Sequence, residues 1–164
     1  MDVQFIWRHG SQNEVVTIFL ENLPSCVTHL KIDFLFFHHL ELKDQLKFQE
    51  FCVKLENKCP SLKTLILHGA CFSFNLQSVV DLCRQYFQNL EVLSLHYSDF
   101  TDYSVKEHCD DFSKIKILDF FCTHRIGSSP ELTFSKMPSL KKISLALTKA
   151  NSNWFHNDIS FLSN

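Results

Sequence analysis

The pattern that most constrains this chain is a recurring triplet of apolar residues with the spacing LxxLxL. It is clearest in residues 88–109, QNLEVLSLHYSDFTDYSVKEHC, where Leu90, Leu93 and Leu95 occupy the three apolar positions. The same spacing recurs at four other places, and successive central residues are 35, 28, 25 and 25 positions apart. The five central residues are Leu30, Leu65, Leu93, Leu118 and Ile143. Recurrence at a period of about 20 to 50 residues is typical of repeat architectures.

Each copy predicts a short strand, and the segments between copies have the apolar spacing of helices. Pro-Ser turns at Pro24-Ser25, Pro60-Ser61 and Pro138-Ser139 precede three of the copies, and proline suits the end of a helix before a strand. Helices are expected over 13–23, 43–59 and 76–87, with a short one over 101–109 and a weaker one over 128–137. In the second helix, the side expected to face the core carries Leu46, Phe48, Phe51, Cys52 and Leu55.

A single strand–helix unit cannot bury its apolar face, whereas stacked units can. The sequence therefore predicts an α/β fold: a solenoid of about five strand–helix units, with a short parallel sheet on the concave side and helices on the convex side. The alternative is an ordinary α/β sandwich in which the spacing arises by chance. The 17 Phe residues predict an interior rich in phenylalanine.

The repeats resemble a known family. Residues 90–109 follow the pattern LxxLxLxxCxxITDxxLxxLxxxC, with Phe100-Thr101-Asp102 in place of Ile-Thr-Asp, and residues 62–83 follow it loosely. Ser98 departs from it, because Cys or Asn is usual at that position. Over residues 23–148 the chain is similar to leucine-rich repeat proteins of the cysteine-containing type, as found in F-box proteins. The resemblance implies a scaffold for protein interaction.

The 164 residues are expected to form one domain. Residues 1–22 would be an N-terminal cap that begins with an edge strand, 23–148 the repeats and 149–164 a C-terminal cap. Both ends carry apolar residues suited to covering the terminal repeats. The longer first repeat is expected to carry an insertion around His38 to Asp44.

Strand alternation places the third, fifth and seventh residues of each repeat on the concave face. One predicted lateral row runs Lys31, Ile66, Ser94, Asp119, Ser144, and another runs Asp33, His68, His96, Phe121, Ala146. An apolar patch rimmed by polar groups is typical of an interaction site, and an aromatic residue often dominates its binding. We therefore expect Phe121 to be the main anchor, unless the C-terminal cap or the first-repeat insertion covers this face. The candidate partner-binding residues are Lys31, Asp33, Ile66, His68, Val92, Ser94, His96, Ile117, Asp119 and Phe121.

Chemical sites are not expected. His68 and His96 are neighbours in a predicted row, with Asp33 or Asp119 nearby, but a flat row of strand residues does not converge on a metal ion as zinc requires. The sequence has no GxSxG motif, and its three Gly cannot build a phosphate-binding loop. We therefore predict no catalytic residues, no cofactor and no small-molecule substrate.

Cysteine usage and charge also bound the function. The seven Cys are odd in number and include no CxxC pair, which predicts buried, reduced thiols. No signal-peptide pattern opens the chain and no apolar run reaches the length of a membrane span. An intracellular protein, cytoplasmic or nuclear and away from membranes, is the expectation. The net charge of −2 makes nucleic acid an unexpected main partner.

The leading interpretation is a non-enzymatic protein-interaction module, acting as a subunit or assembly factor of a larger complex. A substrate-recognition subunit of a ubiquitin ligase is the first alternative, although the residues before Leu23 show no F-box pattern. Residues 78–87, SVVDLCRQYF, resemble an elongin-binding box with Val79 and Phe87 as departures, but they also fit a helix that faces the core. A ribosome- or RNA-associated factor is the second alternative, supported only by scattered Lys and His with Phe and Tyr.

Overall fold

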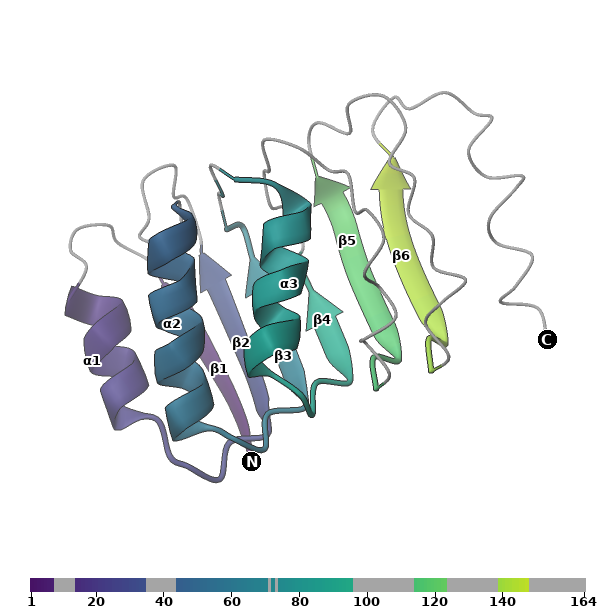
Figure 1. Ribbon diagram of the computed structural model, residues 1–164. Helices are drawn as coiled ribbons and strands as arrows, with labels where there is room; N and C mark the ends of the chain where they lie inside the picture. Colours follow the sequence, from purple (N-terminus) through teal and green to yellow (C-terminus); the bar gives the residue numbers. More distant parts are fainter. Residues whose placement is uncertain are drawn as a thin grey trace.

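The computed structural model describes residues 1–7, 14–34, 44–70, 72, 74–95, 114–123 and 139–147. Within these residues the chain has an α/β fold, with one sheet and a layer of helices (Figure 1). The strands are β1 (Asp2–Trp7), β2 (His29–Phe34), β3 (Thr64–His68), β4 (Val92–Ser94), β5 (Ile117–Thr123) and β6 (Lys142–Leu147). The helices are α1 (Glu14–Asn22), α2 (Gln45–Lys58) and α3 (Leu76–Tyr86).

The sheet is parallel throughout, and its strands follow chain order from β1 to β6. Leu30 is opposite Leu65, and Leu65 is opposite Leu93. The row continues through Leu118 to Ile143. The five strands predicted from the leucine spacing are therefore confirmed, together with their lateral register.

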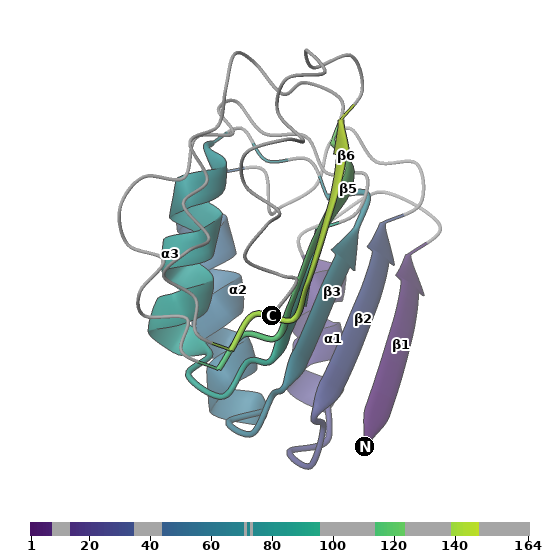
Figure 2. The same ribbon diagram turned by 90° about the vertical axis from the view of Figure 1, so that its right-hand side faces the viewer.

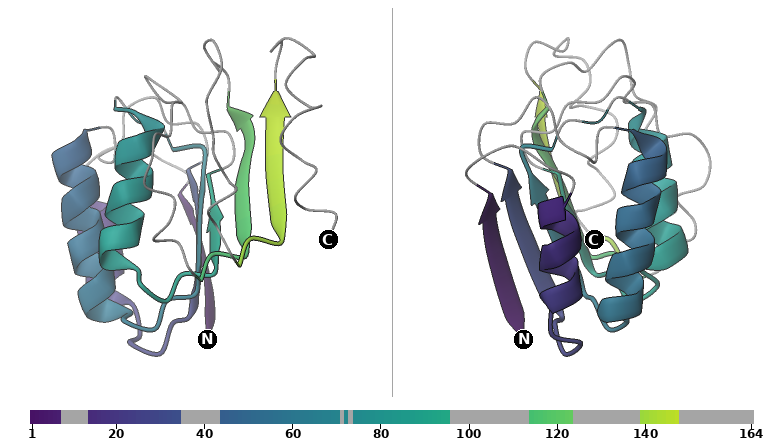
Figure 3. Two further views of the ribbon diagram at one scale, coloured as in Figure 1. Left: turned by 45° about the vertical axis from the view of Figure 1, so that its right-hand side comes forward. Right: turned by 90° about the vertical axis from the view of Figure 1, so that its left-hand side faces the viewer.

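The three helices lie side by side on one face of the sheet (Figures 2 and 3). The Asp44 side chain caps α2 by accepting a hydrogen bond from Lys47 N at 3.0 Å. Asn75 caps α3 in the same way through Ser78 N at 2.8 Å. A side-chain acceptor satisfies a backbone donor that the first turn of a helix leaves open. The predicted helices over 13–23, 43–59 and 76–87 are confirmed within a few residues, while 101–109 and 128–137 lie outside the described residues.

Identical turns lead from α2 into β3 and from α3 into β4. Cys59 N donates to Leu55 O at the end of α2, and Leu62 N then donates back to Cys59 O. Phe87, Cys83 and Leu90 make the same two bonds after α3. The two turns are 28 residues apart, which is the separation of Leu65 from Leu93. The repeat is thus visible in backbone hydrogen bonds as well as in apolar spacing.

The core lies between the sheet and the helices. The described side chains of the LxxLxL triplets from Val27 to Leu118 fill it from the sheet side, and the central residues Leu30, Leu65, Leu93 and Leu118 are all buried. Phe48 packs against the rings of Phe51, Phe72 and Phe74 at centroid distances of 6.0, 5.3 and 5.9 Å. The prediction of an interior rich in phenylalanine is confirmed for this end of the core.

One expectation about an individual residue needs correction. Leu46 is 72% exposed, although we expected it on the buried side of α2. Leu55 follows it by nine residues, which is half a turn out of phase at 3.6 residues per turn, and Leu55 is fully buried. The edge strand expected at the start of the chain is confirmed, because β1 is the outer strand of the sheet next to β2. Val3 is opposite Leu30 and precedes it by 27 positions.

The turn after β3 depends on a glycine. Gly69 has φ +73, and a Cβ atom at this position would stand 2.6 Å from Phe34 O of the neighbouring strand. An L-residue rarely adopts this backbone conformation, and no side chain fits so close to a carbonyl oxygen. Gly69 therefore lets the chain leave β3 directly against the end of β2.

Among the described residues, no helix has both the length and the apolar character needed to cross a lipid bilayer. The proposed C-terminal cap, 149–164, and the 38–43 part of the first-repeat insertion lie outside the described residues.

Candidate protein-interaction face

The face of the sheet that points away from α1–α3 is called the helix-free face below. Its side chains come from the strand residues that alternate with the buried leucines. The predicted row from Lys31 through Ile66 and Ser94 to Asp119 and Ser144 is confirmed by the strand pairings. In the second predicted row, Asp33 is opposite His68. His96 lies outside the described residues, and Phe121 lies in β5 but its side chain is likewise outside them.

The centre of the helix-free face is apolar. Val92 is directly opposite Ile117, and Ile66 stands on β3 two residues beyond Thr64, the other neighbour of Val92. All three apolar side chains are half-buried, in contrast to the leucines on the opposite face. The sheet therefore presents three branched apolar side chains on neighbouring strands, and these residues are called the apolar centre below.

One side of this centre carries an ionic group organised by Asp33. Asp33 Oδ1 lies 2.9 Å from His68 Nδ1, and Asp33 Oδ2 lies 3.1 Å from Lys31 Nζ. Gln4 Nε2 donates to Asp33 Oδ2 at 3.0 Å. Three adjacent strands, β1, β2 and β3, thus supply the four residues of this Asp33 cluster. With both carboxylate oxygens engaged, the cluster fixes the directions in which His68 and Lys31 face the surface.

A second polar feature lies where the strands begin. Glu91 Oε2 accepts a hydrogen bond from Lys116 Nζ at 2.6 Å, and Glu91 Oε1 lies 3.9 Å from Lys63 Nζ. The hydrogen bond from the Lys116 ammonium holds the pKa of Glu91 below its usual range. Backbone bonds join the same residues, because Glu91 N donates to Lys63 O and Lys116 N donates to Glu91 O.

More lysines surround this acidic residue. Lys141 N donates to Lys116 O and so extends the backbone row by one strand. Lys114 Nζ donates to Asn89 Oδ1 at 2.8 Å, and Lys142 begins β6 with an exposed side chain. The lysine row, as it is called below, consists of Lys63, Lys114, Lys116, Lys141 and Lys142. These five lysines outnumber the one acidic residue, Glu91, that they flank. The end of the sheet where the described strands begin is therefore positively charged here.

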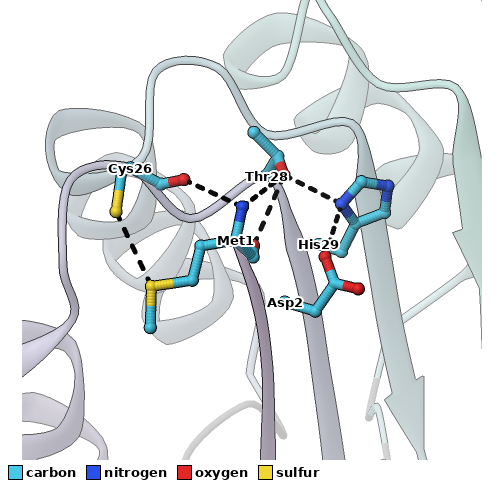
Figure 4. A network of polar contacts seen from close by, with 5 residues as sticks. All are labelled: Met1, Asp2, Cys26, Thr28 and His29. Atoms are coloured by element: carbon cyan, nitrogen blue, oxygen red, sulfur yellow. Dashed lines mark hydrogen bonds and ion pairs between the residues drawn. The ribbon is translucent and has the colours of Figure 1, made fainter.

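The start of β1 is tied to the turn before β2 (Figure 4). The amino group of Met1 donates to Thr28 Oγ1 at 3.1 Å, and Cys26 Sγ donates to Met1 Sδ at 3.6 Å. His29 Nδ1 lies 3.0 Å from Asp2 Oδ1 and 2.8 Å from Thr28 Oγ1. These contacts hold β1 in register with β2 at the edge of the helix-free face.

Ser94 is a correction to the predicted surface. It points to the helix-free face but is only 4% exposed. Its lateral neighbours are Ile66 and Asp119, whose larger side chains stand on either side and shield the short Ser94 side chain. Ser94 therefore supports the surface rather than presenting a contact of its own.

Sequence reasoning missed Gln4, Glu91 and Lys116 as members of the polar rim. Gln4 joins Asp33 across 29 residues of sequence, and no motif surrounds either residue. A usable signal was present for Glu91 and Lys116, since each stands two residues before the central residue of its repeat. Once the repeats are stacked, residues at equivalent positions become lateral neighbours.

The described residues include no group of three or more His, Cys, Asp and Glu side chains placed to hold a metal ion. Cys26, Cys52, Cys59 and Cys83 carry free thiols, and all but Cys26 are buried. Burial raises the pKa of Cys52, and contact with Cys83 raises it further. A thiol held protonated in this way is a poor nucleophile.

The segment 78–87 forms most of α3, and its apolar residues face the core. Val79, Val80, Cys83 and Phe87 are all buried. The interpretation of this segment as a core-facing helix is therefore confirmed. Of the four positions by which it resembles an elongin-binding box, Val79, Cys83 and Phe87 are buried and Ser78 is half-buried.

No protein-family model, curated protein or solved structure matches this chain. The resemblance to leucine-rich repeats stays a prediction drawn from the residue spacing.

Proposed function

We propose that this chain is a leucine-rich repeat solenoid whose helix-free face, on the concave side, binds a protein partner without catalysing a reaction. The observation that carries the proposal is the apolar centre of Ile66, Val92 and Ile117, which no helix of the described residues covers. Polar groups border this centre on two sides. An apolar surface with a polar rim is the usual composition of a protein-binding site.

The rim defines the chemistry of the partner. The lysine row is positive, and Lys31 and His68 of the Asp33 cluster present further donors. We propose a partner surface with an aliphatic or aromatic centre and acidic residues along the side that meets the lysine row. Complementary charge of this kind raises the association rate and fixes orientation more than it raises affinity.

The test uses a matched pair of substitutions that introduce the same charge on opposite sides of the molecule. Ile66→Asp places a carboxylate in the apolar centre, and Gln85→Asp places one on the exposed surface of α3. Proteins retained by the wild-type chain and by Gln85→Asp, but lost with Ile66→Asp, are the candidate partners. Each is then purified and titrated against the three chains by calorimetry.

The expected loss for Ile66→Asp is more than about 2 kcal/mol of binding free energy, the scale of an interface hot spot. Thermal unfolding of both variants checks that the fold is retained. If Gln85→Asp abolishes binding while Ile66→Asp binds normally, the helix layer is the functional surface and the proposal fails. Phe121→Asp, compared in the same titration, tests whether the aromatic residue predicted from the sequence adds to the apolar centre.

The lysine row favours one second candidate, an RNA- or ribosome-associated role. The five lysines of the lysine row lie at one end of the sheet and can contact phosphates, even in a chain of net charge −2. Binding that is mainly electrostatic weakens steeply with salt because counterions are released. Lys116→Glu should abolish such binding, whereas it should mainly slow association with a protein partner. A role as a receptor in a ubiquitin ligase remains a narrower form of the leading proposal, in which the partner is a degradation substrate.

A further inference from the structure

β1 is one of the two outer strands of the described sheet; the other is β6. β1 pairs with β2 on one side, and no described strand pairs with the other. Met1 O accepts hydrogen bonds from Thr28 N and His29 N, so the backbone groups of Met1 point toward β2. Backbone groups alternate in direction along a strand, so those of Val3 and Phe5 also point toward β2. The backbone groups of Asp2, Gln4 and Ile6 consequently point to the open edge.

Among the described residues, this edge has little of the usual protection against pairing. Natural edge strands carry lysine, proline or a bulge, or are very short. The sequence of β1 is DVQFIW, which contains neither lysine nor proline, and its six residues pair with β2 in unbroken register. Such a strand is a suitable template for another strand.

The core beside β1 is open as well. Val3 and Phe5 are only partly buried, whereas Leu30 and Ile32, their partners on β2, are buried. An open groove of about 300 Å³ runs between β1 and α1. Its lining is mainly apolar and consists of Val3, Phe5, Ile18, Phe19, Asn22, Leu23 and Pro24. Ile18 is 54% exposed there, and Phe19 stacks on Phe5 at 4.2 Å between ring centroids.

We propose that β1 pairs with β1 of a second copy of this chain, in antiparallel orientation about a two-fold axis at Gln4. Gln4 then meets Gln4 of the second copy, and Asp2 meets Ile6. All of these residues direct their backbone groups to the open edge, so they form the hydrogen-bonded pairs of an antiparallel ladder.

The side chains are compatible with this register. Val3 is placed opposite Phe5 of the second copy on the buried face, and the two grooves close against each other. No residue of like charge faces another, because Asp2 is opposite Ile6. The two-fold contact uses one surface patch on both copies and pairs the β1 edge of each. The resulting sheet keeps its helices on one face, so the dimer presents two helix-free faces to a multivalent partner.

The test is the mass of the purified chain in solution over a micromolar dilution series, measured by sedimentation equilibrium. The expected result is a species of twice the 19.2 kDa chain mass that dissociates on dilution. Gln4→Pro removes a backbone donor from the open edge and leaves the backbone bonds of Val3 and Phe5 to β2, but it also removes the side-chain bond from Gln4 to Asp33. Ile18→Glu places a charge in the groove at a side chain that is exposed in the single chain, so its fold is retained.

Each variant should raise the dissociation constant of the dimer by at least about tenfold. Leu46→Glu is the matched control, because Leu46 is also apolar and exposed but lies on α2, away from the groove. It should leave the dimer unchanged. Amide exchange adds a residue-level reading: the amides of Gln4 and Ile6 should exchange more slowly at high protein concentration.

Three results would overturn the proposal. The wild-type chain could stay monomeric throughout the series, which would leave the edge to a strand from a different protein. The dimer could persist in both Gln4→Pro and Ile18→Glu, which would place the contact elsewhere. Masses that grow beyond the dimer with concentration would indicate head-to-tail stacking of solenoid ends instead.

Discussion

The two faces of the sheet use the same strands for different purposes. Leu93 and Val92 are adjacent in β4, yet Leu93 is fully buried against the helix layer while Val92 is half-buried on the helix-free face. On the helix side, the lateral row that contains Leu93 is aliphatic in every strand from β1 to β6. On the helix-free face, the row through Val92 changes from Thr64 to Ile117 and Lys142.

This difference shows which residues the fold constrains. Within the described residues, the strands that face α1–α3 must bury apolar side chains against the helix layer. The helix-free face has no such requirement in the described residues, so its chemistry can vary along the row. Variation on a rigid scaffold is what a recognition surface needs.

The largest effect is expected from a pair of substitutions at these adjacent residues. Leu93→Ala should lower the free energy of unfolding by about 2 to 5 kcal/mol, because it leaves a cavity in the core. Val92→Ala should cost about 1 kcal/mol or less, because its side chain loses little buried area. Urea unfolding of both variants measures the difference. Equal losses would mean that the two faces are equally packed, and the comparison would fail.

A second substitution tests the backbone of the turn that follows β3. Gly69→Ala should destabilise the protein by about 1 to 3 kcal/mol, because alanine is strained at positive φ. The Cβ atom also meets Phe34 O across the strands, which pushes β3 from β2 and disturbs the contact of His68 with Asp33. Unfolding experiments measure the loss of stability, and the ring signals of His68 in NMR report the disturbed cluster. An unchanged midpoint would show that the turn relaxes without strain.

The helix layer can be weakened without touching the sheet. Asn75→Ala removes the side chain that accepts from Ser78 N, and loss of an N-cap of this kind costs about 0.5 to 2 kcal/mol. Asn75→Asp restores an acceptor and should recover most of the stability. The measurement is thermal unfolding of the three chains. Partner binding at the helix-free face should be unchanged in both variants, which sharpens the separation between the two faces.

The smallest effect is expected at the lysine row. The folded-state pKa of Glu91 is lowered by Lys116, so its contribution is present above its unfolded pKa and is lost as pH falls through the folded value. Glu91→Gln should therefore reduce stability slightly at neutral pH and not at strongly acidic pH. Thermal midpoints of both chains across the acidic range test this. A constant difference at every pH would exclude the ion pair as its cause.

Much of the fold follows from the sequence because its signals are local and repeated. The LxxLxL spacing identifies five strands, and it also gives their register, since equivalent positions of stacked units become lateral neighbours. The helices follow from apolar spacing between the copies. The error at Leu46 could have been avoided from the sequence. Leu46 and Leu55 are nine residues apart, and this separation places them on opposite sides of a helix.

The first strand shows a different limit. Only Val3 and Phe5 of β1 match apolar positions of the triplet. The pairing of β1 with β2 is what places them in the same lateral rows as Leu30 and Ile32.

The sequence by itself determined the parallel strand order, the lateral row of leucines and the division of each strand into a buried and an outward side. These follow from chain-local periodicity and from the need of each unit to bury one face. Tertiary structure alone decided which polar groups meet on the outward side. Gln4, Lys31 and His68 reach one carboxylate because three strands bring them within hydrogen-bonding distance, and Ser94 is shielded because larger side chains flank it. Such contacts depend on side-chain length and direction across strands, and the repeat pattern predicts only that Asp33 is beside His68.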